Sequence, residues 1–147
     1  MSARYKQLED VARDWMNTIW TKKEFGQFSK FHHPQMTDMS PAGRDSNREA
    51  YEESIQALFQ TFPNFTAFVE DIIVDELKGK SAIRWSASAS QHGDFYGLKP
   101  TGKAIFFTGI EILAIDQDGL ITERWGEWDG LSILEQITRS NETDAND

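Results

Sequence analysis

Apolar side chains recur every three or four residues over about residues 3–21, which predicts an amphipathic helix whose second half carries Trp15 and Trp20. A short helix is expected next, over about residues 23–30. The stretch that follows, "FHHPQMTDMSPAGRDS", is interrupted by two prolines and predicts a loop or a short extended segment.

A further helix is predicted to begin at Ser46, because a serine followed three residues later by Glu49 is the pattern of a capping box. Apolar residues keep the helical spacing until Pro63, which cannot continue a helix. Strand patterns follow: "FTAFVEDIIV", "SAIRWSASASQH", "KAIFFTGIEILAI" and "LITERWGEWD" are rich in β-branched and aromatic residues. "DQDG" predicts a hairpin turn between the last two strands, and "LSILEQI" predicts a closing helical turn.

This order of elements, with helices first and an antiparallel meander afterwards, predicts an α+β fold in which the helices lie on one face of the sheet. The chain has 147 residues, which is most simply one domain over residues 1–140 followed by a polar, flexible tail over residues 141–147.

Composition narrows the possible partners and compartments. The net charge of −9 opposes binding to nucleic acid or to an anionic membrane, since both require a basic face. The absence of cysteine excludes disulfides and thiolate catalysis, and it fits a reducing compartment. The charged N-terminal stretch does not have the pattern of a signal peptide, and no apolar run is long enough to span a membrane. We therefore expect a cytoplasmic protein.

Three stretches of the chain, "FPNFTAFVEDIIVDELKGKSAIRWSASA", "SQHGDFYGLKPTGKAIFFTGIEI" and "DGLITERWGEWDGLSILEQI", fall within about residues 44–137. They resemble the SnoaL-like polyketide cyclases and ester cyclases of the NTF2-like superfamily. The resemblance implies a cone, in which a strongly curved antiparallel sheet wraps the N-terminal helices and encloses an apolar pocket. It also implies a homodimer formed through the sheet. In the cyclases an aspartate on the last strand acts as acid and base in a cofactor-free aldol ring closure.

The position that corresponds to this aspartate is Gly126, which cannot transfer a proton. Strand alternation places the adjacent Glu127 on the opposite face. Asp129 matches a second acid of the family, with an alternative role as the N-cap of the following helix. Asp38, in "PQMTDMSP", lies where the family often has a pocket asparagine or histidine, and it is the best remaining carboxylate for a general base.

Three further polar residues and several aromatic residues complete the candidate site. Gln91 aligns with a pocket histidine of the family and is expected to orient a carbonyl or hydroxyl group. His92 suits acid–base catalysis, with a histidine at the loop mouth as the alternative. Arg124 is expected to stabilise an enolate or to bind a carboxylate, with an exposed salt bridge as the alternative. The expected ligand-binding walls, which could equally be plain core, are Trp85, Tyr96, Phe106, Gly126 and Trp128.

No metal site is predicted. His32 and His33 are adjacent and point apart in an extended chain, and the acidic turn at residues 116–119 lacks the remaining ligands of a calcium loop.

Three functions remain open. The first is a cofactor-free enzyme that performs aldol-type cyclisation, isomerisation or hydrolysis on a small apolar carbonyl compound. The second is a binding protein without catalysis, which Gly126 favours. The third is a dimeric assembly subunit with Trp125 on its outer sheet face.

Overall fold

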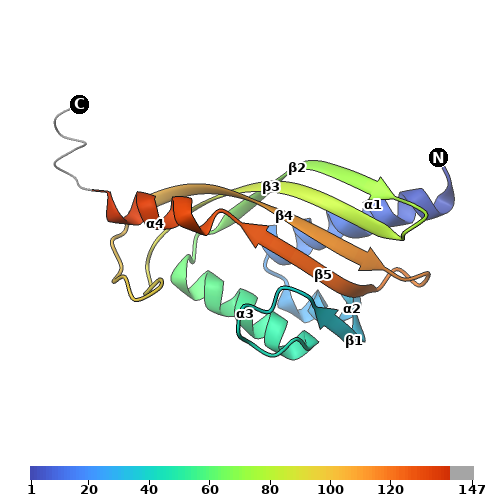
Figure 1. Ribbon diagram of the computed structural model, residues 1–147, viewed down its shortest axis with the longest axis horizontal. Coiled ribbons are helices and arrows are strands. Elements are labelled where there is room, and N and C mark those ends of the chain that lie inside the picture. Colours follow the sequence, from blue (N-terminus) through green and yellow to red (C-terminus); the bar gives the residue numbers. More distant parts are fainter. Residues whose placement is uncertain (140–147) are drawn as a thin grey trace.

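The computed structural model describes residues 1–139 and consists of four α-helices and a curved five-stranded sheet in that part of the chain (Figure 1). The tail predicted for residues 141–147 lies outside the described residues. The elements are α1 (Ala3–Trp15), a π-helical segment (Met16–Thr21), a 3-10 turn (Phe25–Gln27), α2 (Phe28–Phe31), β1 (His32–Asp38), α3 (Arg48–Thr61), β2 (Thr66–Asp75), β3 (Lys80–Ser90), β4 (Ala104–Ile115), β5 (Ile121–Trp128) and α4 (Gly130–Thr138). This confirms the predicted α+β class.

The first helix follows its predicted extent but changes type near its end. Ser2 caps α1 by accepting a hydrogen bond from the backbone N–H of Tyr5. The chain then continues as the π-helical segment, where the N–H of Lys22 bonds to the carbonyl of Asn17, five residues earlier. The apolar face of this long helix is buried at Leu8, Ala12, Trp15, Met16 and Ile19.

The capping residue of α3 differs from the prediction. Asn47, not Ser46, accepts a hydrogen bond from the N–H of Ala50 and is the N-cap. The backbone carbonyl of Ser46 instead bonds to the N–H of Asp38, so this serine joins the start of α3 to the end of β1.

The sheet has the strand order β1-β5-β4-β3-β2. Strands β2 to β5 form the predicted antiparallel meander, but β1 pairs in parallel with β5, so the sheet is mixed. The segment at residues 32–38, expected as a loop or extended stretch, is this edge strand. Its register shifts between His32 and Thr37, around Pro34, which an edge strand tolerates because it has a free side.

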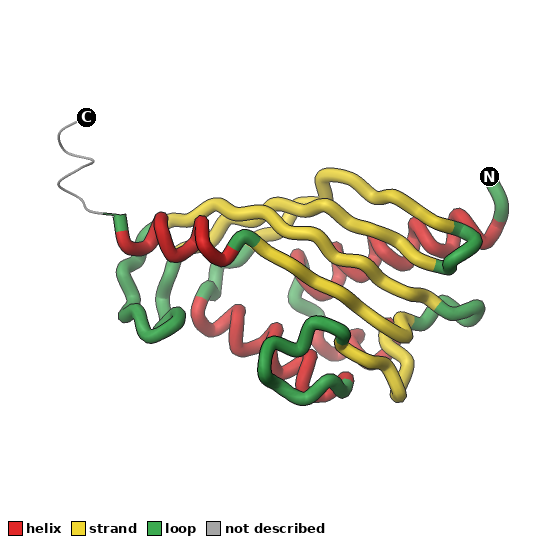
Figure 2. Tube along the Cα trace, viewed as in Figure 1, coloured by secondary structure: helices red, strands yellow, loops and turns green. Residues whose placement is uncertain are grey.

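The two faces of the sheet have different surroundings. Helices α1, α2 and α3 lie against one face, and no helix of residues 1–139 covers the other face (Figure 1; Figure 2). On β4 the inward set is Ile105, Phe107, Gly109, Glu111, Leu113 and Ile115, and it is buried throughout. This inward set contains one charged residue, Glu111. No helix within residues 1–139 is both long and apolar enough to cross a membrane.

Candidate functional site

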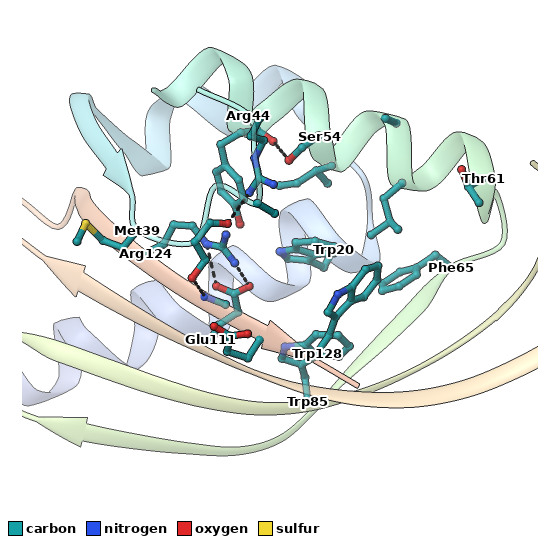
Figure 3. Close-up of a pocket in the computed structure, with 18 of the residues that line it drawn as sticks. Trp20, Met39, Arg44, Ser54, Thr61, Phe65, Trp85, Glu111, Arg124 and Trp128 are labelled. Carbon is teal, nitrogen blue, oxygen red and sulfur yellow. Dashed lines mark hydrogen bonds and ion pairs between the residues drawn. The ribbon is translucent and has the colours of Figure 1, made fainter. Parts of the chain in front are cut away.

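A cavity of about 680 Å³ lies between α3 and the inward face of the sheet (Figure 3). Its floor comes from β3, β4 and β5, its roof from α3, and one side from the loop at residues 39–47. The aromatic part of the wall consists of Trp20, Phe65, Trp85, Tyr96 and Trp128. Ile55, Ala57 and Leu58 of α3 add aliphatic surface. Most of the lining is therefore apolar.

One end of this cavity is polar, because Glu111 of β4, Arg124 of β5 and Arg44 of the 39–47 loop lie on its wall, with Asp38 of β1 behind them. Arg124 of β5 donates from Nε to Oε2 of Glu111 at 3.1 Å and from Nη2 to Oε1 of the same carboxylate. Its Nη1 donates to Oδ1 of Asp38 at 3.0 Å. Arg44, from the 39–47 loop, pairs with Oδ2 of Asp38. The ion-pair cluster of Asp38, Arg44, Glu111 and Arg124 contains two positive and two negative groups. Figure 3 shows Arg44, Glu111 and Arg124 of this cluster.

Sheet register brings these side chains together. Asp38 is opposite Arg124 across the β1–β5 ladder, and Glu111 is opposite Gly126 across the β4–β5 ladder. The N–H of Met39 bonds to the carbonyl of Arg124, which holds the start of the 39–47 loop against β5. The positions therefore follow from strand pairing, although the residues are up to 86 apart in sequence.

Gly126 is the residue that makes room for the cluster. A Cβ atom built on Gly126 would collide with Nη2 of Arg124 and with Oε1 of Glu111. The Arg124–Glu111 ion pair thus occupies the space in which a side chain at position 126 would begin.

Burial sets the protonation of two groups at the polar end. It raises the pKa of Glu111 to about 7, although the Arg124 charge acts in the opposite direction. Burial also raises the pKa of the Tyr51 hydroxyl well above its usual value, so this phenol stays protonated at neutral pH. The Tyr51 ring lies against Arg124, with the guanidinium carbon 4.5 Å from the ring centroid.

Three buried donors on the cavity wall have no hydrogen-bond partner within residues 1–139. They are Nε1 of Trp20, Nε of Arg44 and the hydroxyl of Tyr51. A buried polar atom without a partner costs about 1–3 kcal/mol, and such atoms are few in native proteins. All three can donate a hydrogen bond, so the wall is suited to a ligand that presents acceptor oxygens.

The apolar end depends on a second close approach to a glycine. A Cβ on Gly109 would collide with the indole of Trp85. Trp85 therefore lies flat over β4, where it packs edge-on against Phe107, and Phe107 packs edge-on against Trp128. Trp85 and Trp128 line the cavity at this end, and Phe107 packs between them.

Five of the predicted site residues line this cavity: Trp85, Tyr96, Arg124, Gly126 and Trp128. Tyr96 lies at the rim and is 75% exposed. Asp38 is fully buried beneath Arg124 and does not line the cavity. Both of its oxygens are engaged, since Oδ1 accepts from Arg124 and from the N–H of Ser40, and Oδ2 accepts from Arg44.

Two predicted placements differ from the structure. Phe106 points to the outer face and is 64% exposed, while its neighbour Phe107 is the inward residue. Gln91 is buried but does not line the cavity. Its amide donates to the carbonyls of Gly93 and Leu98 and accepts from Thr101, so it closes the loop at residues 91–103.

The remaining candidates lie away from the cavity. His92 is exposed, and its backbone N–H bonds to the carbonyl of Thr61. Asp129 caps α4 by accepting from the N–H of Ser132, the alternative weighed for it above. His32 is a core residue that accepts from the indole of Trp15 and stacks on Phe28. No group of three or more potential metal-ligating side chains forms within residues 1–139.

Sequence reasoning missed Glu111 and Tyr51. The alternation of β4 contained a signal for Glu111, because one charged residue interrupts an otherwise apolar inward set. Tyr51 has no comparable signal, since it occupies an ordinary apolar position of a helical pattern.

Comparisons with known proteins agree with this geometry. The family model described as SnoaL-like polyketide cyclase matches residues 10–137. None of the curated proteins gives a significant match.

Solved structures share the fold over nearly the whole chain. A candidate SnoaL-like polyketide cyclase from Jannaschia has a TM-score of 0.84 at 17% identity, covering 95% of this chain and 97% of the other. IdmH, a candidate polyketide cyclase from Streptomyces antibioticus, has a TM-score of 0.79 at 22% identity, covering 90% and 99%. AclR, a candidate hydroxylase from Streptomyces galilaeus, has a TM-score of 0.78 at 19% identity, covering 90% and 96%. These likenesses show the NTF2-like fold alone, and the fold does not fix the chemistry.

Proposed function

The chain belongs to the SnoaL-like polyketide cyclase family, and on that basis we propose that its cavity binds a small apolar molecule with carbonyl oxygens and catalyses proton transfer on it without a cofactor. One observation carries the binding part of the proposal. Three buried donors on the cavity wall lack partners within the described residues, and an apolar ligand with acceptor oxygens would satisfy them.

The catalytic part rests on the polar end of the cavity. Arg124 and the donors beside it would stabilise negative charge that develops on a ligand oxygen, as preorganised donors do in a site that excludes water. Aldol-type cyclisation and isomerisation both pass through such an enolate. Asp38 holds Arg124 in place from behind, so we assign it a positioning role.

Binding can be tested with a matched pair of compounds, 2-tetralone and its hydrocarbon analogue tetralin. Both are titrated calorimetrically into the wild-type chain and into Tyr51→Phe. We expect Tyr51→Phe to weaken 2-tetralone binding roughly five- to tenfold, the value of about one hydrogen bond. Tetralin binding should stay within about twofold, because tetralin has no acceptor.

Tyr5→Phe is the matched control, because Tyr5 is a half-buried residue of α1 that does not line the cavity. It should leave both affinities unchanged. A wild-type chain that binds neither compound, or a Tyr51→Phe effect of equal size on both, would contradict the proposal.

A binding protein without catalysis is the second candidate. Gly126 favours it, because no side chain at that position can move a proton. A non-catalytic protein would bind 2-tetralone in the same way and would differ only in having no turnover.

We also propose that two copies pair through the uncovered outer face of the sheet. Large apolar side chains are exposed there on β2 and β4: Phe68, Ile73, Phe106 and Ile110. The expected absence of a cofactor and the expected cytoplasmic location stay predictions.

A further inference from the structure

Among the carboxylates of residues 1–139, Glu111 is distinguished by its buried place on the cavity wall. Among the described residues that line the cavity, the acidic side chains are Glu111 and Glu127. Glu127 belongs to the outward set of β5 and is exposed. Glu111 belongs to the inward set of β4 and is only 5% exposed. It is therefore the carboxylate that a ligand inside the cavity would meet.

The Glu111 carboxylate also reaches across the sheet onto the neighbouring strand. Its Oε1 lies within contact distance of the point where Cβ of residue 126 would be. A carboxylate carried by β4 thus occupies the position from which a side chain of β5 would enter the cavity. Gly126 is required for this, since any larger residue would displace the carboxylate or the Arg124 guanidinium.

We propose that Glu111 is the residue that takes a proton from the bound ligand and returns it. This rests on the proposed function above and names the group that carries out its proton transfer. In this proposal Glu111 of β4 replaces the aspartate that the family's cyclases carry on their last strand, which corresponds to β5 here. Strand β4 is the neighbour of β5 on the side towards the middle of the sheet.

The surroundings of Glu111 suit a proton acceptor. Burial raises the pKa of its carboxyl to about 7, so both protonation states are populated near neutral pH, where a general base is most effective. Each oxygen uses one lone pair to accept from Arg124 and keeps another for a proton. When Glu111 is protonated, Asp38 remains as the counter-ion of Arg124.

The step balances without a co-reactant. The Glu111 carboxylate takes the proton from a carbon next to a ligand carbonyl, and the electron pair of the broken C–H bond moves into the enolate. The enolate oxygen accepts hydrogen bonds from the unpartnered donors of Tyr51 and Arg44. The enolate carbon then bonds to a second carbonyl carbon of the same ligand, and the resulting alkoxide takes the proton back from Glu111.

Base-promoted ring opening of 5-nitrobenzisoxazole tests this step without knowledge of the natural ligand. A carboxylate removes the proton at C3 of this flat apolar compound, the C–H electrons form a nitrile, and the N–O bond breaks to give a coloured phenolate. We expect the wild-type rate to saturate with probe concentration. We also expect it to rise with pH through a midpoint near 7, the value of the Glu111 carboxyl.

Glu111→Gln should lower the rate at least a hundredfold, because the amide cannot accept the proton. Glu123→Gln is the matched control, since Glu123 lies on β5 and does not line this cavity, and its rate should stay within about twofold of the wild-type rate. Probe binding is measured separately by quenching of the cavity tryptophans and should be retained in both variants. If Glu111→Gln does not fold, Glu111→Asp replaces it, with an expected loss of at least tenfold at retained binding.

Each other outcome would overturn the assignment. The role of Glu111 would be refuted if bound probe reacted as fast in Glu111→Gln as in the wild type. The same holds for Glu111→Asp where that variant replaces it, and in both cases the proposed binding would stay intact. Bound probe that reacts no faster in the wild type than in acetate buffer would refute catalysis in this cavity and favour the non-catalytic candidate. A wild-type chain that does not bind the probe would count against both proposals.

Discussion

The Arg124 guanidinium and the Glu111 carboxylate meet over a backbone that has no side chain, and this makes Gly126 a packing requirement of the site. Nothing about its backbone conformation demands glycine, because its φ lies outside the positive range. The requirement is steric. It links a residue that cannot do acid–base chemistry to the carboxylate that we propose does it.

Replacing Gly126 with alanine should therefore destabilise the chain by about 1–3 kcal/mol, the usual cost of overpacking a filled site. The added methyl group must displace Arg124, which is held by Glu111 on one side and Asp38 on the other. Gly26→Ala is the control, because a Cβ on Gly26 meets no atom within 4 Å, and it should change stability by about 0.5 kcal/mol or less. Urea unfolding of the two variants measures the difference, and equal effects would contradict the steric argument.

His32 should make stability depend on pH. Burial lowers the pKa of His32 from 6.5 to about 4, so the folded chain keeps the ring neutral where the unfolded chain protonates it. The unfolded state binds more protons between these values, and stability is lost as pH falls through that window. The wild type should lose about 2–3 kcal/mol more than His32→Gln between pH 7.5 and 4.5.

The adjacent His33 supplies the control for this measurement. It is half-buried and bonds through its ring to the backbone N–H of Gln35, outside the core. His33→Gln should keep the wild-type pH dependence. If the free energy of unfolding fell equally with pH in the wild type and in His32→Gln, His32 would have the same pKa in the folded and unfolded states, which contradicts the prediction.

At the level of elements, the sequence pattern located the helices and strands well but left the faces of one strand undecided. The helix over residues 3–21, the meander and the closing helix agree with the structure. On β4, apolar residues occupy both faces, so alternation alone could not tell whether Phe106 or Phe107 points inward. The same ambiguity weakened the signal that Glu111 gives as a charged residue in a largely apolar strand. Its burial depends on pairing with β5, which local sequence does not contain.

The edge strand β1 shows a similar limit. It pairs with β5, which comes much later in the chain, and it contacts the start of α3, which follows a loop. Pro34 also argues against a strand when only the local sequence is considered. Asp38 could be singled out as a carboxylate, but its position behind Arg124 follows from the parallel β1–β5 pairing.

The N-cap of α3 should contribute measurably to stability. This helix supplies Tyr51, Ser54, Ile55, Ala57 and Leu58 to the cavity wall, so its first turn positions the site. Asn47→Ala removes the side chain that caps the helix and should cost about 1 kcal/mol. Ser46→Ala should cost less than about 0.5 kcal/mol, because Ser46 contributes its backbone carbonyl, which alanine retains. Thermal unfolding distinguishes the two, and a larger loss for Ser46→Ala would restore the capping box predicted from the sequence.

At the scale of the whole molecule, the cavity occupies one face of the sheet and leaves the opposite face to another role. The Trp125 ring is on that outer face, covered by Lys80, whose ammonium lies 4.6 Å from the ring centroid. Phe106 and Ile110 are 64% and 52% exposed on the neighbouring strand. Exposed apolar side chains gathered on one face of a sheet are typical of a protein–protein interface.

We expect the wild type to sediment as a dimer of about twice the 16.8 kDa chain mass. The double variant Phe106→Glu and Ile110→Glu should be monomeric at the same concentration, because four carboxylates would have to be buried in each pair of chains. Leu77→Glu is the control. Leu77 is fully exposed in the turn between β2 and β3, away from the centre of the outer face, and its replacement should leave the dimer intact.

Cavity binding of 2-tetralone should persist in the monomeric variant, since the cavity and the outer face lie on opposite sides of the same strands. A monomeric wild type, or a dimer that survives both glutamates, would place any self-association elsewhere on the surface.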